Sequence, residues 1–85
     1  MKVTKRNGNV VMYDDEKVAT SIVWANGRTP EETITIKMAK RIADEVFRRL
    51  TSEKDIISTA EIRDCVCQVL NEMGYPLTAE HYLDK

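Results

Sequence analysis

Residues 3–13 read Val3-Thr4-Lys5-Arg6-Asn7-Gly8-Asn9-Val10-Val11-Met12-Tyr13. Two β-prone runs flank Asn7-Gly8, and Asn-Gly is the strongest short signal for a β-hairpin because both residues tolerate positive φ. We therefore predict strands over residues 3–6 and 10–13. Two strands are only marginally stable alone, so the hairpin must pack against the rest of the chain.

Two helices are predicted directly after the hairpin. The first begins with Asp14 or Asp15 as its cap, carries apolar residues at helical spacing and ends at Asn26-Gly27. The second begins at Thr29-Pro30, where a Thr cap precedes proline at the first helical position and Glu32 follows three residues after the Thr. Its apolar residues recur every fourth position over about 20 residues, or about 30 Å. The two apolar rows are Ile34, Met38, Ile42, Val46, Leu50 and Ala39, Ala43, Phe47.

The remaining segment predicts one strand and two helices. Ile56-Ile57 is apolar and β-branched, and it is short enough for a single edge strand. Residues 58–61 have the capping-box pattern and begin a third helix that ends at Gly74. Pro76 then opens a last short helix. The apolar face of the third helix is expected to contain Ile62, Val66, Val69, Leu70 and Met73.

These elements predict an α+β fold for one domain that covers residues 1–85. Their order is β-β-α-α-β-α-α. The arrangement that buries the apolar faces is a four-helix bundle capped at one end by a small three-stranded sheet.

Composition and charge exclude several function classes. The 85 residues carry 13 Lys and Arg against 14 Asp and Glu, so the formal charge is −1. This balance argues against a general nucleic-acid binder and against a polybasic membrane anchor. No apolar run approaches the roughly 18–20 residues of a membrane span, and the first six residues lack the apolar core of a signal peptide. We therefore expect a cytoplasmic protein that contacts neither nucleic acid nor membrane directly.

The sequence offers few residues for catalysis or metal binding. Cys65 and Cys67 would face different sides of a helix, so they would not easily form a disulfide with each other. His81 is the only histidine, which leaves too few ligands for a zinc site. There is no Ser–His–Asp or Cys–His set whose members are expected to meet, and no Walker-type phosphate loop. We expect reduced thiols, no metal and no catalytic residues.

Basic residues around the hairpin define a candidate anion site. Lys5 and Arg6 stand directly before the turn, on opposite faces of the predicted strand, and Lys17 opens the first helix. The N-terminus of the third helix at Thr59 would add unpaired N–H groups and the positive end of the helix dipole. The residues alone leave two interpretations open, which are a polyanion site and solvated basic side chains at strand ends.

Three motifs stand in order along the chain, with matching spacing. They are Val3-Thr4-Lys5-Arg6-Asn7-Gly8 with Asp14-Asp15-Glu16-Lys17-Val18, then Ile57-Ser58-Thr59-Ala60-Glu61-Ile62-Arg63-Asp64, then Gly74-Tyr75-Pro76 with Ala79 and Tyr82. Together they resemble the ATP-cone domain, the regulatory nucleotide-binding module at the N-terminus of many ribonucleotide reductases. The resemblance covers essentially the whole chain. The fold known for that family, a four-helix bundle under a three-stranded sheet, agrees with the elements predicted above.

The resemblance assigns roles to residues of the hairpin and the first helix. Lys5 and Lys17 match lysines that contact nucleotide phosphates, and Arg6 matches the neighbouring basic position. Val3 and Thr4 match strand residues whose backbone and side chains border the adenine.

Further roles fall on the first and third helices. Val18 and Ile62 match apolar residues that sandwich the base, and Thr59 matches a hydroxyl residue near the sugar and phosphates. Arg63 stands where relatives vary, at a position from which it could reach the phosphates or close the pocket. Val11 is a departure, because many reductase cones carry a nucleotide-recognising Glu there.

The function implied by the resemblance is reversible binding of ATP or dATP, with or without Mg²⁺, by a regulatory module that is not an enzyme. Expected partners are the adenine nucleotide and the catalytic domain of a reductase, or another cone through oligomerisation. We expect the N-terminal allosteric domain of a ribonucleotide reductase or a stand-alone cone.

Two alternatives remain. A protein-interaction domain that has lost nucleotide binding is favoured by Val11 and by the sequence pI near 5.8. Part of a transcriptional regulator is expected less, because the repressor relatives place a four-cysteine zinc ribbon ahead of the cone and none precedes the hairpin.

Overall fold

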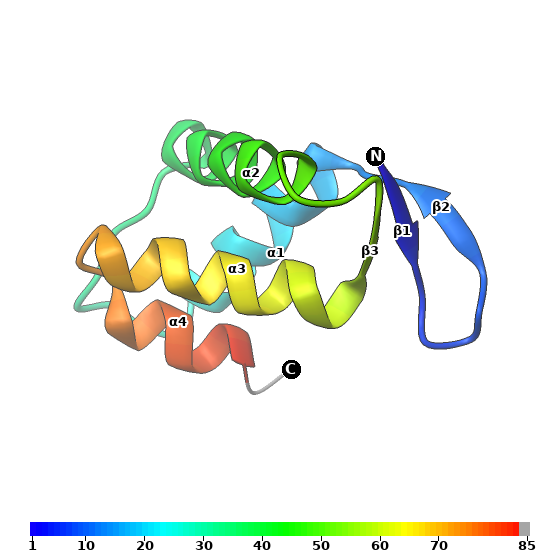
Figure 1. The fold of residues 1–85 in the computed structure, drawn as a ribbon. Helices are drawn as coiled ribbons and strands as arrows, with labels where there is room; N and C mark the ends of the chain where they lie inside the picture. Colours follow the sequence, from blue (N-terminus) through cyan, green and yellow to red (C-terminus); the bar gives the residue numbers. More distant parts are fainter. Residues whose placement is uncertain (84–85) are drawn as a thin grey trace.

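A computed structural model describes residues 1–83, and within them four helices and three strands follow the predicted order (Figure 1). The α+β class and the element order are therefore confirmed. The strands are β1 Lys2–Thr4, β2 Val10–Met12 and β3 Ile56–Ser58. The helices are α1 Asp15–Asn26, α2 Ile36–Thr51, α3 Thr59–Glu72 and α4 Pro76–Leu83.

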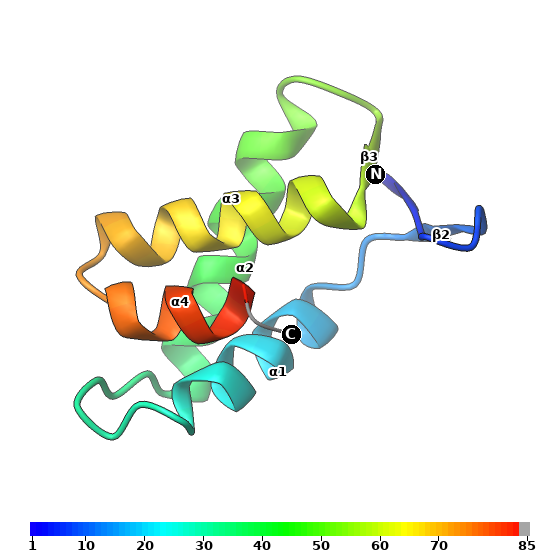
Figure 2. The same ribbon diagram turned by 90° about the horizontal axis from the view of Figure 1, so that it is seen from below.

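The four helices form a closed ring of contacts around one apolar core. Helix α1 packs on α2 and α4, while α3 packs on α2 and α4. Figure 2 shows α3 and α4 side by side, with α2 crossing behind them. The residues at the centre of this core have almost no exposed surface, and they are Ile22, Ile42, Val46, Val66 and Leu70. None of the helices within residues 1–83 has the length and apolar character needed to cross a membrane.

A three-stranded sheet lies at one end of the helices, with β1 at its centre (Figure 1). Strand β1 pairs antiparallel with β2 and parallel with β3, so Val3 stands between Val11 and Ile57. Val3 and Ile57 are buried and belong to the core. The inner face of the sheet therefore caps the helices, and the end of β3 leads directly into α3.

The hairpin is confirmed, but its strands are shorter than predicted because residues 5–9 form the turn. The Gly8 N–H donates to the Lys5 carbonyl at 2.9 Å, and the Lys5 N–H donates to the Asn9 carbonyl at 2.8 Å. Gly8 has φ +87°, and no non-glycine residue within 1–83 has positive φ. Such a turn needs a single left-handed residue. Asn7 therefore contributes its side chain instead, whose carbonyl oxygen accepts from the Asn9 N–H at 3.0 Å.

The predicted start of the second helix is wrong, because α2 begins at Ile36 rather than at Pro30. Its cap is Thr35, whose hydroxyl accepts from the Met38 N–H at 3.2 Å. Thr29 caps nothing: its buried hydroxyl donates to the Asn26 carbonyl at 3.1 Å. The Thr-x-x-Glu pattern that suggested a helix start has a different cause.

That cause is a set of polar contacts that we call the polar lock, formed by Asn26, Thr29, Glu32 and Thr78. The Glu32 carboxylate accepts from the N–H groups of Leu77 and Thr78 at 3.0 and 2.8 Å, and from the Thr78 hydroxyl at 2.8 Å. Glu32 thus caps α4. Burial alone would raise the pKa of Glu32, but the N–H groups of Thr78 and Leu77 outweigh it and hold this pKa below its ordinary value.

Asn26 completes the polar lock from the end of α1. Its side-chain N–H₂ donates to the Glu32 carbonyl at 2.8 Å and to the Thr78 hydroxyl at 3.1 Å, while its side-chain oxygen accepts from the Ile34 N–H at 3.0 Å. The loop between α1 and α2 is therefore fastened to α4, and Ile34 joins the core without being helical.

Helix α3 begins and ends with the predicted signals. Ser58 and Glu61 form a reciprocal capping box. After the helix, the Tyr75 N–H donates to the Leu70 carbonyl at 2.8 Å, and Gly74 has φ +87°. These are marks of a Schellman motif, in which glycine supplies the left-handed residue. Met73 was predicted on the apolar face but is exposed, since it lies at the C-cap rather than inside the helix.

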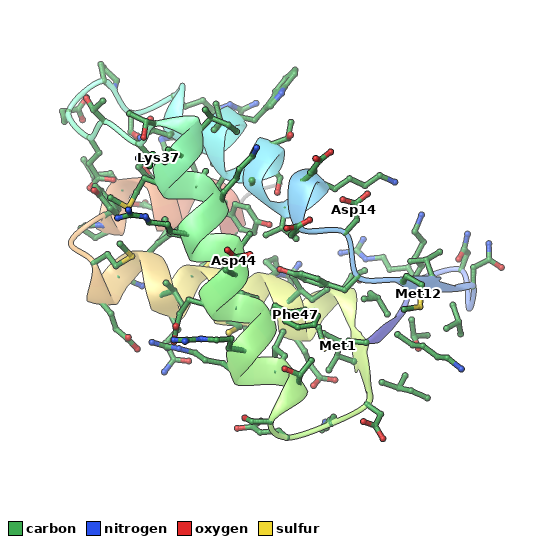
Figure 3. The ribbon with its side chains drawn as sticks, turned by 90° about the horizontal axis from the view of Figure 1, so that it is seen from above. Met1, Met12, Asp14, Lys37, Asp44 and Phe47 are labelled. Atoms are coloured by element: carbon green, nitrogen blue, oxygen red, sulfur yellow. The ribbon has the colours of Figure 1, made fainter. Side chains whose placement is uncertain are left out.

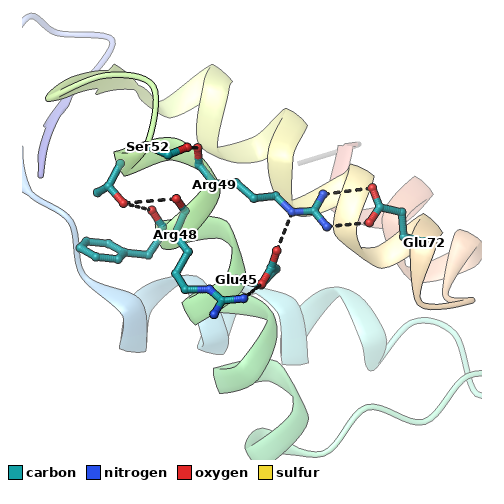
Figure 4. A network of polar contacts seen from close by, with 7 residues as sticks. Glu45, Arg48, Arg49, Ser52 and Glu72 are labelled. Atoms are coloured by element: carbon teal, nitrogen blue, oxygen red, sulfur yellow. Dashed lines mark hydrogen bonds and ion pairs between the residues drawn. The ribbon is translucent and has the colours of Figure 1, made fainter.

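A bidentate ion pair joins α2 to α3 on the surface (Figure 4). The Arg49 guanidinium donates to the two Glu72 carboxylate oxygens at 2.6 and 3.0 Å, and its Nε donates to Glu45 at 2.8 Å. These contacts lower the pKa of Glu72 and of Glu45. Because the groups are partly exposed, their contribution to stability is modest.

We expect Thr78→Val to destabilise the domain by about 1–3 kcal/mol, because it would leave buried partners of the polar lock without a hydrogen bond. Urea unfolding followed by circular dichroism measures this change. Thr33→Val is the matched control, since Thr33 is exposed on the loop between α1 and α2 and should change stability by about 0.5 kcal/mol or less. Equal stability of the two variants would show that the polar lock is unimportant.

Candidate functional site

Two adjoining cavities lie where the sheet meets the ends of α1, α3 and α4. The first has a volume of about 320 Å³ and the second about 400 Å³. Lys5, Thr59, Arg63 and Tyr82 line both, so the two form one continuous site. Figure 3 shows Met12 on the hairpin and Asp14 at the start of α1, two further residues that line the first cavity.

All nine residues singled out from the sequence line this site. Lys5, Thr59 and Arg63 border both cavities. The first cavity adds Val3, Lys17, Val18 and Ile62, and the second adds Thr4 and Arg6. Residues from three elements (β1, α1 and α3) and the hairpin turn are thus brought together, while their role in binding stays a prediction.

The first cavity has apolar walls supplied by the core. Val3, Val18 and Ile62 come from β1, α1 and α3, and all three are buried. Their packing role and a role as cavity wall are compatible, because the cavity opens at the margin of the core. Val11 also lines this cavity, opposite Val3 in the strand register, and gives it an apolar side chain.

The backbone N–H and C=O groups of β1 are used for hydrogen bonds within the sheet. Residues of a central strand direct their N–H and C=O groups alternately to the two neighbouring strands. The register pairs Val3 with Val11 and Thr4 with Ser58. The backbone groups of Val3 and Thr4 are therefore used in pairing, and the polar groups of the first cavity must come from side chains.

Ser21 and Tyr82 supply such groups, although neither was among the site residues predicted from the sequence. The Ser21 hydroxyl donates to the Val18 carbonyl at 2.8 Å and lies 3.0 Å from the Tyr82 hydroxyl. A hydroxyl has one proton, so Tyr82 is the donor to Ser21. Burial raises the pKa of Tyr82, which keeps it protonated. The available signals were the spacing of Ser21 from Val18 and the position of Tyr82 in the third quoted motif.

Tyr13 is another lining residue that was not singled out. Its hydroxyl donates to the Ala43 carbonyl at 2.9 Å, and its ring packs against Phe47 with centroids 5.2 Å apart. Tyr13 therefore fixes the chain between β2 and α1 on helix α2, which holds one wall of the first cavity in place.

Cationic side chains line both cavities: Lys5 and Arg63 border the two, Arg6 borders the second and Lys17 borders the first. Within residues 1–83, Lys5, Arg6 and Lys17 form no ion pair. Arg63 has a buried Nε with no hydrogen-bond partner, and the nearest carboxylate oxygen, on Asp64, lies 3.9 Å away. The site therefore holds positive charge that the described part of the protein does not neutralise.

The N-terminus of α3 adds donors to this region. Thr59 and Ala60 line the second cavity, and the Ala60 N–H has no partner inside the helix. Lys5 and Arg6 both border the same cavity, so the expectation that they face opposite sides was wrong. The reason is that both lie in the turn, beyond the end of β1.

The cysteines lie apart from the site. Cys65 and Cys67 are buried free thiols in α3, and burial raises the pKa of both. The Cys67 thiol donates to the Ala79 carbonyl at 3.5 Å. Across the described residues, His, Cys, Asp and Glu side chains form no group of three or more that could hold a metal ion.

A family model described as the ATP cone domain matches residues 1–84. A search of curated proteins found no match to this chain.

Proposed function

Because this chain belongs to the ATP-cone domain family, we propose that its adjoining cavities bind ATP or dATP, with or without Mg²⁺. The family is one of nucleotide-binding regulatory modules. The proposed function is thus ligand binding that controls a partner, with no bond made or broken. The observation that supports it best is the junction of an apolar cavity with a cation-lined one at Lys5, Thr59 and Arg63.

The proposed pose follows from the chemistry of the two cavities. The base occupies the first cavity between Val18 and Ile62, because apolar walls suit an aromatic ring. The phosphates extend from the second cavity toward Lys5 and Lys17 of the first, because side-chain cations and the start of α3 favour negative charge. Arg63 borders both cavities, and its buried Nε would gain a partner from the ligand.

The regulated partner is proposed to be the catalytic domain of a ribonucleotide reductase, or another cone. A nucleotide changes such an assembly only if it binds the associated and dissociated forms with different affinity. We also propose a cytoplasmic location, which the free thiols Cys65 and Cys67 support.

A thermal-shift titration tests binding itself. Ligand at about 100 times its dissociation constant should stabilise the domain by about 2.7 kcal/mol. No stabilisation by ATP or dATP would favour the alternative of an interaction domain that has lost nucleotide binding. Val11, which lines the first cavity, is the residue that favours this alternative.

Lys5→Ala and Lys17→Ala should each weaken ATP binding by about tenfold or more, because a charge-assisted hydrogen bond contributes about 1.5–3 kcal/mol. Isothermal titration calorimetry on the purified variants measures this. Lys37→Ala is the matched control, since Figure 3 shows Lys37 at the start of α2, away from the hairpin. Wild-type affinity in both cavity variants would place the phosphates elsewhere.

Adenine should be preferred over guanine. Ser21 and Tyr82 have their protons engaged, so the Ser21 oxygen presents an acceptor to the first cavity. Adenine offers an amine where guanine offers a carbonyl, and a mismatched buried polar group costs affinity. Competition binding with GTP tests this preference, and Ser21→Ala should reduce it whereas Thr20→Ala, on the exposed face of α1, should not. GTP competing as well as dATP would contradict the proposed pose.

ATP and dATP should bind with affinities within about tenfold, or about 1.4 kcal/mol. They differ by one 2′-hydroxyl, and Val11 has no polar group to recognise it. Thr59 both donates and accepts hydrogen bonds, so it discriminates weakly. Calorimetry with each nucleotide measures the ratio, and sizing chromatography shows whether the two complexes assemble differently. A ratio far above tenfold would mean that another group reads the sugar.

A further inference from the structure

Strand β2 is an edge strand made only of exposed apolar residues. The exposed fractions are 55% for Val10, 39% for Val11 and 65% for Met12. Strand order β2-β1-β3 leaves one side of β2 without a neighbour among the described residues. Proteins commonly protect such edges with charged residues, proline or a bulge within the strand, and β2 has no charge and no proline.

The backbone of β2 offers a matched set of free groups. The pairs Lys5–Asn9 and Met1–Tyr13 are hydrogen-bonded, and such pairs alternate along an antiparallel ladder. Val11 therefore pairs with β1, while the N–H and C=O groups of Val10 and Met12 point to the open side. The opposite edge differs, because the outward Ser58 N–H of β3 donates to Glu61 at 3.3 Å.

These free groups are self-complementary. In an antiparallel two-fold arrangement centred on Val11, Val10 of one copy lies opposite Met12 of the second copy. Both are outward-pointing residues, so each such pair exchanges two hydrogen bonds and the two pairs together make four. The same arrangement sets Val10 against Met12 side chains on the outer face and Val11 against Val11 on the inner face.

Charge at the two ends of the hairpin favours this orientation. Lys5 and Arg6 lie at the turn before β2, and Asp15 and Glu16 lie just after it, at the start of α1. Within residues 1–83, Arg6, Asp15 and Glu16 form no ion pair. In the antiparallel arrangement, the basic turn of each copy lies near the acidic start of α1 in the other copy. A parallel arrangement would instead place like charges opposite each other.

We propose that two copies of this chain associate through β2, forming one continuous six-stranded sheet across a two-fold axis. The contact surface is small compared with stable dimers, so the association is weak and depends on protein concentration. The association requires no nucleotide. A test of the dimer is therefore independent of whether the two cavities bind ATP or dATP.

Sedimentation equilibrium on the 85-residue chain without nucleotide tests the proposal. A monomer–dimer equilibrium is expected, and Val10→Lys should raise its dissociation constant by about tenfold or more, because two added charges would enter one interface. Ile56→Lys is the matched control: Ile56 is 54% exposed on the opposite edge strand and should leave the equilibrium unchanged. Thermal unfolding of both variants verifies that they are folded.

A charge exchange tests the orientation. Arg6→Glu and Asp15→Arg should each weaken the dimer, and the double variant should restore it, because both ends then carry exchanged signs. A wild-type chain that stays monomeric at the highest soluble concentration would overturn the proposal. So would a Val10→Lys variant that dimerises like the wild type, or an Ile56→Lys variant that is equally impaired.

Discussion

The parallel pairing of Val3 with Ile57 is the contact on which the candidate site depends. It places β3 beside β1, and α3 begins at the residue that follows β3. Thr59 and Arg63 therefore reach the hairpin turn, where Lys5 and Arg6 lie. Without this pairing the hairpin would be an isolated two-stranded element, and the basic turn would have no helix N-terminus beside it.

The polar lock acts at the other end of the bundle and complements that pairing. It fixes the start of α4 through Glu32 and Thr78, so the end of α4 lies against α1. Tyr82 can then meet Ser21 in the first cavity. A hydrogen-bonded core of this kind gives rigidity only when every group is satisfied, and Thr78 meets that condition with contacts to three side chains. The two constraints together hold the first cavity between the sheet and α4.

Local signals predicted most of the fold, and long-range contacts account for the errors. The Asn7-Gly8 turn, the Ser58 capping box and the Gly74 stop act through neighbours in sequence, so they were visible there. Glu32 looked like part of a helix start because its real partners, Leu77 and Thr78, lie far along the chain. The nine residues chosen from the sequence do line one site, yet Ser21 and Tyr82 were not predicted to belong to it, because only tertiary packing joins them.

The central place of β1 also governs how this chain must fold as it is synthesised. The hairpin leaves the ribosome before α1 and α2, but the parallel partner of β1 at residues 56–58 is made only after these two helices. Until then the hairpin lacks its third strand, and Val3 cannot be fully buried because the core is incomplete. Pairings between distant segments are slow to form and leave apolar surface open meanwhile. The nascent hairpin thus stays accessible to chaperones until residues 56–58 have been made.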